Sequence, residues 1–357
     1  MAQVALGSTT RPRLAYFGTW VDPIALQILD AFDDLDLVRL DYDSPPSTNW
    51  AEMARAHGYH VRPRSELRKP WFGSAELLAR CPHMLALSST GAGYDYIDVD
   101  ACTAAGVIVC DQGGTNREAV AEHALGLMLA LSKRIHQGDR ALRRGGSVDR
   151  FALAGNDLRG KTVGIVGLGS IGSRLAALCG TLFDMRVLAY DPYLTEAQIR
   201  DRSALASDWE NLLRRADFVS VHCPLTRETT NMFGAAEFAA MRPTAFFVTT
   251  ARGGIHDEIA LAEALREGRL AGAGVDVFLH EPPTADHPLF HLDTVIATPH
   301  TAGVTQEALR EMAAEAARQW LTVFSGRAPP RLVNPEAWPA YTRHFEQLLG
   351  FTPAPLK

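Results

Sequence analysis

The sequence predicts an α/β protein with two domains on parallel β-sheets, one of them a Rossmann-type doubly wound nucleotide domain. Three observations support this fold class. The 357 residues are too many for one ordinary hydrophobic core. Short apolar β-type segments alternate with helical segments in two successive series, which is the pattern of parallel sheets. Finally, TVGIVGLGSIGSRLA at 162–176 has the order strand, glycine turn and helix.

Composition and charge exclude several classes of function. Hydrophobic residues make up 47% of the chain and charged residues 21%, as in globular proteins. The net charge of −6 offers no attraction to nucleic acid or to an anionic membrane. No apolar run approaches the roughly 20 residues of a membrane span, and the start, MAQVALGSTTRPR, lacks the apolar stretch of a secretory signal. We therefore expect a cytoplasmic protein.

Neither the cysteines nor the histidines form a metal-binding pattern. No CxxC pair occurs, so reduced and mostly buried thiols are expected at Cys81, Cys102, Cys110, Cys179 and Cys223. No metal site is expected either, because helical ligand spacing is absent from His280, His287, His291 and His300.

The first βα series occupies about the first hundred residues. Its strands are predicted at 14–18, 35–40, 83–89 and 107–110, with helical stretches such as DPIALQILDAF between them. The amphipathic segment 118–137 contains no proline and is predicted to be one helix. The polar, glycine-bearing segment 144–161 is predicted to be a loop or linker.

The second series runs from Thr162 to about Pro299. Its strands are predicted at 162–167, 186–190, 217–222, 245–250, 272–278 and 294–298. Another helix is predicted at 305–324. The tail from Ala328 is rich in proline and aromatic residues and is predicted to be a packed arm, with Trp338, Tyr341 and Phe345 as its aromatic anchors.

A dinucleotide site is predicted at the glycine turn. Gly167, Gly169 and Gly172 fit G-x-G-x-x-G, whose glycines allow the tight turn, the approach of the pyrophosphate and the close packing of helix on strand. Backbone N–H groups of Ser170 and Ile171 would bind the phosphates at the helix N-terminus. After the next strand, Asp191 would accept hydrogen bonds from the adenosine ribose hydroxyls. The alternative is a glycine turn in a flavodoxin-like domain with a surface aspartate.

Three reactive side chains each follow a predicted strand in the same series. Arg252 suits a carboxylate, which its guanidinium can bind with two hydrogen bonds. His300 suits a general acid/base, and Glu281 is the candidate carboxylate beside it. Taken singly, each residue is more simply a surface or capping residue. Their common place at strand ends in one nucleotide-binding unit favours an active site.

In the first domain, SSTGAGYDYIDVDA at 88–101 places Gly91 and Gly93 in a loop after a strand. Exposed backbone N–H groups in such a loop can bind a carboxylate. An ordinary βα turn is the alternative.

With these motifs the chain resembles the D-isomer-specific 2-hydroxyacid dehydrogenase family. The resemblance covers nearly everything from about Leu85 to Val304. It rests on STGAGYDYID, NREAVAEHALGLML, GKTVGIVGLGSIG, AYDPY, HCPLTRETTNMF, TTARGG, GVDVFLHEPP and TPHTAG. Two positions depart from the family pattern. Thr249 stands where the family often has asparagine, and Phe151 is the only aromatic residue in a linker that often carries tryptophan.

The resemblance implies a nucleotide domain inserted into a discontinuous substrate domain. The boundaries it implies are 1–117 with 303–357 for a flavodoxin-like substrate domain, and 118–302 for the Rossmann NAD-binding domain. It makes Arg252 the substrate clamp, His300 the acid/base and Glu281 its partner. Asp276 would bond the nicotinamide carboxamide, and Gly91, Ala92 and Gly93 the substrate carboxylate. Further NAD contacts are implied at His222, Pro224, Thr250 and Ala251.

The expected function is NAD-dependent interconversion of a 2-oxo acid and a D-2-hydroxy acid. One alternative is a phosphite-type dehydrogenase of the same family; formate enzymes carry glutamine where this chain has Glu281. The other is a non-catalytic, NADH-sensing protein that resembles a corepressor. The substrate stays open among hydroxypyruvate, glyoxylate, phosphoglycerate and bulkier 2-oxo acids. No arginine flanks the 88–101 loop in the sequence, which weakens the case for a phosphorylated substrate. Trp20 is a candidate for the pocket, although core packing is favoured.

A homodimer with an isologous interface centred on residues 118–155 is also expected. The helix predicted at 118–137 carries one apolar face at Val120, Ala124, Leu127, Met128, Leu131 and Ile135. Ala121, Leu125, Leu129 and Ser132 widen the apolar surface beyond what one core contact requires. The area of such an interface should exceed roughly 2,000 Å². The alternative is a wholly intramolecular helix.

Overall fold

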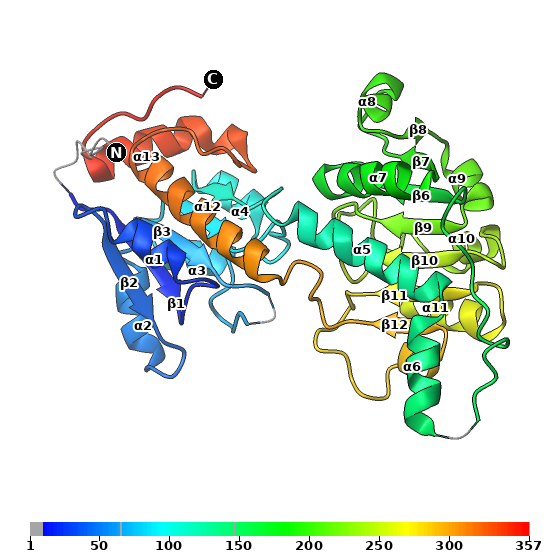
Figure 1. Cartoon of the computed structure of the whole chain (residues 1–357). Coiled ribbons are helices and arrows are strands. Elements are labelled where there is room, and N and C mark those ends of the chain that lie inside the picture. Colours follow the sequence, from blue (N-terminus) through cyan, green and yellow to red (C-terminus); the bar gives the residue numbers. More distant parts are fainter. Residues whose placement is uncertain (1–9, 65, 146, 357) are drawn as a thin grey trace. The chain divides into compact units, whose positions relative to one another are not determined.

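The computed structural model describes residues 10–64, 66–145 and 147–356 (Figure 1). The chain divides into two compact units. The first comprises the chain up to Asn116 together with the part from Gln306 onward, and the second is Arg117–Thr305.

The first unit contains a five-stranded parallel sheet in the order β2-β1-β3-β4-β5. This is the flavodoxin order, as predicted. The strands are β1 (Arg13–Phe17), β2 (Asp36–Leu40), β3 (Gly58–Val61), β4 (Ala86–Ser89) and β5 (Ile108–Cys110). The helices are α1 (Ile24–Leu29), α2 (Pro46–Met53), α3 (Ala75–Arg80), α4 (Val99–Ala104), α12 (Gln306–Phe324) and α13 (Trp338–Leu349).

The second unit contains a seven-stranded parallel sheet in the order β12-β11-β10-β9-β6-β7-β8. When β6 to β12 are counted as strands 1 to 7, the order from β8 to β12 is 3-2-1-4-5-6-7. This is the Rossmann order 3-2-1-4-5-6 with one further strand, so this prediction is also confirmed. The strands are β6 (Thr162–Val166), β7 (Arg186–Tyr190), β8 (Leu205–Ala206), β9 (Phe218–Val221), β10 (Phe246–Thr249), β11 (Gly272–Val275) and β12 (Val295–Ala297). The helices are α5 (Arg117–Ser132), α6 (Ile135–Arg144), α7 (Ser170–Phe183), α8 (Glu196–Asp201), α9 (Trp209–Arg215), α10 (Ala235–Ala240) and α11 (Glu258–Arg266).

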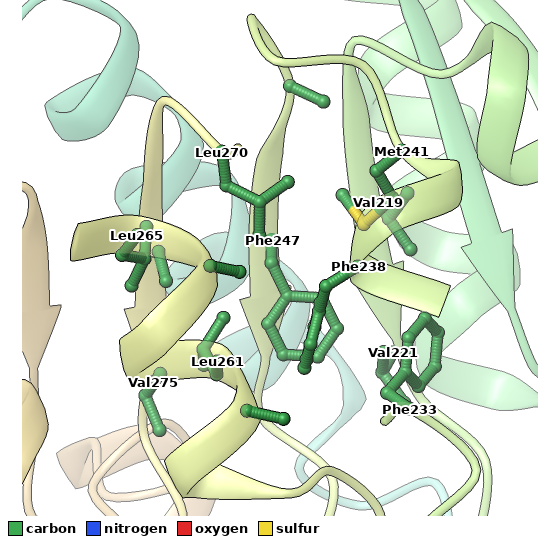
Figure 2. Close-up of a cluster of buried hydrophobic side chains, with 14 of the residues drawn as sticks. Val219, Val221, Phe233, Phe238, Met241, Phe247, Leu261, Leu265, Leu270 and Val275 are labelled. Atoms are coloured by element: carbon green, nitrogen blue, oxygen red, sulfur yellow. The ribbon is translucent and has the colours of Figure 1, made fainter. Parts of the chain in front are cut away.

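The central strands of the second sheet, β6, β9, β10 and β11, are largely buried on both faces, so their residues are mostly apolar. On β10, Phe247 packs into the cluster that includes residues of α9, α10 and α11 (Figure 2). The next residue, Val248, packs into the cluster on the opposite face, with α5 and α7. Such alternation is the period-two geometry of a strand, and it explains why continuous apolar runs predicted these strands.

The prediction of one helix over 118–137 is wrong. Helix α5 ends at Ser132, and α6 begins at Ile135 after Arg134, whose φ of 52° lies in the left-handed region. The backbone carbonyl of Ser132 accepts a hydrogen bond of 2.8 Å from the N–H of Asn156 instead of continuing the helix. A contact between residues 24 positions apart therefore ends the helix, and no local sequence signal marks it.

Because of this break, the predicted apolar face of the 118–137 segment is not one continuous surface. Ile135, expected on the buried face, has 59% of its surface exposed. Ala121, Leu125 and Ser132, expected to need a second chain, are buried within the unit itself.

Strand β3 was not predicted, because His60 interrupts its apolar pattern. The structure buries His60 between aromatic rings: it stacks on Trp20 at 3.9 Å and accepts a hydrogen bond from Trp320 Nε1 at 3.4 Å. Burial lowers the pKa of His60 to about 3. Trp20 therefore belongs to the core, as favoured from the sequence. In the C-terminal arm, the predicted anchors Trp338, Tyr341 and Phe345 are buried, so that prediction is confirmed.

The cysteines are free thiols in the structure. Four of them are buried and Cys223 is half-buried. Among the described residues, no helix is long and apolar enough to cross a membrane, and no cluster of His, Cys, Asp and Glu could hold a metal ion.

One buried histidine should make the second unit sensitive to acid. His256 is 2% exposed, and neither ring nitrogen has a hydrogen-bond partner in the described chain. Burial lowers its pKa to about 4, against the opposing charges of Glu258 and Asp257. Between about pH 6.5 and pH 4 the unfolded chain therefore binds a proton that the folded chain does not, so the free energy of unfolding decreases as the pH falls.

His256→Leu should reduce this decrease by up to about 1.4 kcal/mol per pH unit, the value for one proton. Urea unfolding followed at several pH values between 7 and 4.5 would measure it. The exposed His291 provides the control substitution, His291→Leu, which should keep the pH dependence of the unmodified protein. An unaltered slope in His256→Leu would show that His256 is not responsible.

Candidate active site

The glycine turn after β6 gives each of its three glycines a different surrounding. Gly167 has a φ of 87°, and a Cβ there would lie 2.6 Å from the backbone nitrogen of Cys223. At Gly172 a Cβ would lie 2.2 Å from the carbonyl oxygen of Gly167. At Gly169, in contrast, it would meet no described atom within 4 Å. The protein itself requires glycine at the first and third positions, and the space at the second fits a ligand that approaches the turn closely.

Helix α7 begins at Ser170, directly after this turn. Its first N–H groups, including those of Ser170 and Ile171, have no acceptor within the helix and favour an anion. Asp191, which follows β7, lies at the same turn, because its Oδ2 accepts a hydrogen bond of 2.9 Å from the N–H of Leu168. The Leu168 carbonyl accepts one of 2.6 Å from Arg202 Nη1. The turn and the acidic side chain are thus brought together as the spacing predicted.

Buried polar atoms without protein partners lie at the ends of β9 and β10. His222 Nε2 contacts Ser220 Oγ at 2.8 Å, whereas its Nδ1 has no partner in the described chain. Burial lowers the pKa of His222 to about 4. The hydroxyls of Thr249 and Thr250 are also buried without partners there. Because unsatisfied buried polar atoms are rare, these atoms fit a site completed by a polar ligand such as a dinucleotide.

Two further predicted cofactor residues, Pro224 and Ala251, differ in exposure. Ala251 is buried next to Thr250, while Pro224 is exposed.

His300 and Glu281 form the hydrogen-bonded pair that the sequence predicted. His300 Nδ1 and Glu281 Oε2 are 2.8 Å apart. The other carboxylate oxygen accepts a hydrogen bond of 3.0 Å from the N–H of Phe278. Burial raises the pKa of Glu281, but the hydrogen bond and charge of His300, the Phe278 N–H and the charge of Arg252 together lower it below its usual value. Nδ1 is thereby engaged, and Nε2 is the ring nitrogen that can exchange a proton with a substrate.

Arg252 lies close to this pair because of a close approach between two backbone segments. Its neighbour Gly253 packs against the 278–279 segment so tightly that a Cβ would lie 1.9 Å from the carbonyl oxygen of Phe278. Arg252 Nη1 also donates a hydrogen bond of 2.6 Å to the carbonyl of Ala251. The structure thus brings the arginine, the glutamate and the histidine into one site.

The turn that carries His300 is held by Asp276, which follows β11 and is completely buried. One carboxylate oxygen accepts hydrogen bonds from Thr298 Oγ1 at 2.6 Å and the N–H of Thr301 at 2.8 Å. The other accepts one of 2.9 Å from the N–H of Ala302. The Asp276 carbonyl accepts the N–H of His300 at 2.7 Å. His300 has a φ of 56°, a left-handed conformation that costs a non-glycine residue on the order of 1–2 kcal/mol, and these bonds offset that cost.

Two residues of this network were not found from the sequence. Thr298 donates its hydroxyl proton to Asp276, so it can accept a hydrogen bond from His123 Nε2 at 3.1 Å. A histidine within the apolar α5 was the one available signal, and only the fold identifies its partner.

In the first unit, the 91–93 loop has a fixed peptide orientation. The carbonyl of Gly91 accepts hydrogen bonds from Ser89 Oγ at 2.7 Å and from the N–H of Gln112 at 3.0 Å. Because the C=O and N–H of a trans peptide point in opposite directions, the N–H of Ala92 points away from these partners. That orientation suits the predicted binding of a carboxylate. Ser89 and Gln112 were not identified from the sequence.

Arginines do lie near this loop in the fold, although none flanks it in the sequence. Arg64 Nη1 lies 2.8 Å from Asp95 Oδ2. Arg62 follows Val61, whose carbonyl accepts a hydrogen bond of 2.8 Å from Thr90 Oγ1. Within this unit a pocket of 410 Å³ is lined by Gly18, Thr19, Tyr42, Arg62, Glu66, Leu67 and Arg68. Both arginines are paired with a carboxylate, Arg64 with that of Asp95 and Arg62 with that of Glu66.

Comparison with known proteins assigns the second unit to a family. Residues 125–302 match the model of the D-isomer specific 2-hydroxyacid dehydrogenase, NAD binding domain. A glyoxylate reductase of Aeropyrum pernix is 35% identical over 333 residues, which are 91% of this chain and 97% of that protein. A D-3-phosphoglycerate dehydrogenase of Archaeoglobus fulgidus is 40% identical over 234 residues, 66% of this chain. That match covers 44% of the Archaeoglobus protein, so the chain spans less than half the length of this relative.

A solved structure shows the same fold over most of the chain. It is the D-lactate dehydrogenase of Aquifex aeolicus, complexed with NAD and lactic acid. It shares 27% identity and a TM-score of 0.76 with this chain and covers 90% of it, and 98% of that structure is matched.

The glycine turn yields a test of the dinucleotide site. Gly169→Ala should change the free energy of unfolding by less than about 1 kcal/mol, because no described atom opposes the new methyl group. It should weaken NADH binding on the order of tenfold or more, since the methyl group would occupy ligand space. Gly172→Ala should instead destabilise the fold by roughly 1–3 kcal/mol through overpacking. Fluorescence titration with NADH and urea unfolding would measure the two effects, and unchanged NADH affinity in Gly169→Ala would contradict the assignment.

Proposed function

Because the chain belongs to the D-isomer-specific 2-hydroxyacid dehydrogenase family, we propose that it interconverts a 2-oxo acid and a D-2-hydroxy acid with NAD. The observation that carries the proposal is the 2.8 Å contact between His300 Nδ1 and Glu281 Oε2, with Arg252 close enough for its charge to act on Glu281. A nucleotide site alone would suit a binding protein. The acid/base pair beside it supports an enzyme.

When bound, NADH supplies the hydride that reduces the substrate carbonyl. In the proposal, Gly167, Gly169 and Gly172 allow the dinucleotide to approach, and Ser170 and Ile171 bind its phosphates. Asp191 accepts hydrogen bonds from the ribose hydroxyls. A 2′-phosphate would meet like charge at Asp191, which favours NAD over NADP.

The cofactor's other contacts are assigned to the strand ends. The polar atoms without protein partners at His222 and Thr250 are available to it, beside Pro224 and Ala251. Asp276 is assigned to the carboxamide, although its carboxylate already accepts three hydrogen bonds within the protein.

The chain's own groups then bind the substrate and transfer the proton. Arg252 is assigned to the substrate carboxylate, which its guanidinium can bind with two hydrogen bonds. In the first unit, the N–H groups of residues 91–93 are assigned to the binding of a carboxylate. During reduction, protonated His300 donates the Nε2 proton to the carbonyl oxygen. Glu281 keeps the other ring nitrogen protonated and stabilises the imidazolium, so the ring is oriented for the transfer.

The proposed reaction can be tested with NADH and a panel of 2-oxo acids, including glyoxylate, hydroxypyruvate and 3-phosphohydroxypyruvate. At least one should be reduced. His300→Asn should lower kcat by on the order of 10²–10⁴ while the Kd for NADH stays nearly unchanged. In Glu281→Gln, the loss of reductive activity with rising pH should begin at lower pH, because a neutral partner stabilises imidazolium less.

Two outcomes would replace the proposal. NADH binding without turnover of any 2-oxo acid would favour the NADH-sensing alternative. Reduction of NAD by phosphite, with no 2-oxo acid turned over, would favour the phosphite-type enzyme.

We also propose that the protein is a homodimer. The support is now the exposed apolar surface on and after α6, where Ile135, Leu142 and Phe151 expose 59%, 72% and 74% of their surfaces. Isolated apolar residues are common on surfaces, but three in one segment favour an interface.

Light scattering at micromolar concentration should give twice the 38.9 kDa mass of one chain. The double variant Leu142→Glu/Phe151→Glu should shift the mass toward one chain, because a charge buried in an interface without a partner is costly. A mass of one chain for the unmodified protein would refute the dimer.

A further inference from the structure

The segment that carries Glu281 has little packing of its own. Leu279 exposes 55% of its surface, and His280 and Pro282 are also exposed. Only Phe278, at the start of the segment, is buried. Apolar burial therefore cannot determine where the Glu281 carboxylate lies, and hydrogen bonds must do so.

Two carboxylates bind two successive backbone N–H groups of this segment. Glu281 Oε1 accepts the N–H of Phe278 at 3.0 Å, and Glu258 Oε1 accepts the N–H of Leu279 at 2.6 Å. Glu258 is the first residue of α11, and its side chain is 14% exposed. Hydrogen bonds to an ionised acceptor in such surroundings are about twice as strong as neutral ones.

The second oxygen of Glu258 is bound by His287. Glu258 Oε2 and His287 Nε2 are 3.0 Å apart, and the histidine side chain is 12% exposed. His287 Nδ1 accepts a hydrogen bond of 3.4 Å from the N–H of Leu289, so Nε2 carries the proton and donates it to Glu258. The ring also lies edge-on to Phe278, with centroids 5.3 Å apart. Both oxygens of Glu258 are therefore engaged, and its position is set.

We propose that Glu258, held by His287, is a positioning residue for the pair formed by Glu281 and His300. It occupies the N–H of Leu279, which is adjacent to the N–H that Glu281 already binds. Without Glu258, this second N–H would be available to the Glu281 carboxylate and would draw it away from His300. Glu258 thus acts on the proton transfer through Glu281 and touches neither substrate nor cofactor. The expected effects on kcat and on the pH–rate profile rest on the proposed function, whereas the expected effect on the contact between Glu281 and His300 does not.

The test compares Glu258→Ala, Glu281→Gln and the double variant, with Glu263→Gln as the matched control on an exposed position of the same helix. Glu258→Ala should lower kcat on the order of tenfold, as expected for coupled neighbours, with the substrate KM and the Kd for NADH nearly unchanged. Its pH–rate profile should shift in the same direction as that of Glu281→Gln. Added to Glu281→Gln, it should reduce kcat by less than about twofold.

A measurement that needs no turnover tests the positioning role of Glu258 independently of the proposed function. The Nδ1 proton of His300, bound to Glu281, should give a protected side-chain NMR signal that disappears in His300→Asn. The signal should weaken or exchange faster in Glu258→Ala and persist in Glu263→Gln. Should Glu258→Ala fail to fold, Glu258→Gln serves instead, because its amide oxygen can still bind Leu279 N–H but its NH₂ group opposes the N–H of His287.

The proposal is overturned if the His300 signal and the pH–rate profile of the Glu258 variant match those of the Glu263 control. It is also overturned if the losses in Glu258→Ala and Glu281→Gln multiply in the double variant. A protein that reduces no 2-oxo acid, yet loses the His300 signal in Glu258→Ala, would refute the proposed function and retain the positioning role.

Discussion

The buried carboxylate of Asp276 is the constraint on which the reactive part of the second unit depends. Its oxygens accept hydrogen bonds from Thr298, Thr301 and Ala302, and its backbone carbonyl accepts the N–H of His300. An ionised group without solvent contact is tolerated only when its hydrogen bonds are satisfied. Here the donors are provided by the turn that bears the histidine, so the burial of this carboxylate and the left-handed backbone of His300 depend on the same set of hydrogen bonds.

Close backbone contacts bring the other reactive groups to the same place. Gly253 approaches Phe278 more closely than any side chain would permit, and this places Arg252 beside the segment of Glu281. Gly167 approaches the 222–223 backbone in the same way, next to the proposed cofactor site. Glycine is therefore required in both places by the protein's own packing, whereas Gly169 faces open space. The distinction separates residues that build the fold from one that makes room for a ligand.

Most strands and the glycine turn were predictable because their signals are local. A strand buried on both faces is a continuous apolar run, as at Phe246–Thr249. Two strands, Leu205–Ala206 and Gly58–Val61, were not predicted. The second contains His60, which is tolerated because Trp20, Thr90 and Trp320 surround it. These partners come from distant parts of the chain. The end of α5 at Ser132 likewise depends on Asn156 in the following linker. The periodicity of one segment therefore predicts neither the partners of His60 nor the hydrogen bond between Ser132 and Asn156.

The sequence by itself determined the two parallel sheets and the glycine turn with Asp191, and it predicted that Arg252, Glu281 and His300 follow strands of one unit. Apolar periodicity and turn residues specify strands and helices locally, and parallel strands bring their carboxyl ends to one edge of a sheet. Only the tertiary structure decided which groups hold those side chains, namely Asp276 and Thr298 for His300 and Glu258 with His287 for the Glu281 segment. Hydrogen bonds between distant residues depend on distances and orientations set by the whole fold, and no local pattern of residues encodes them.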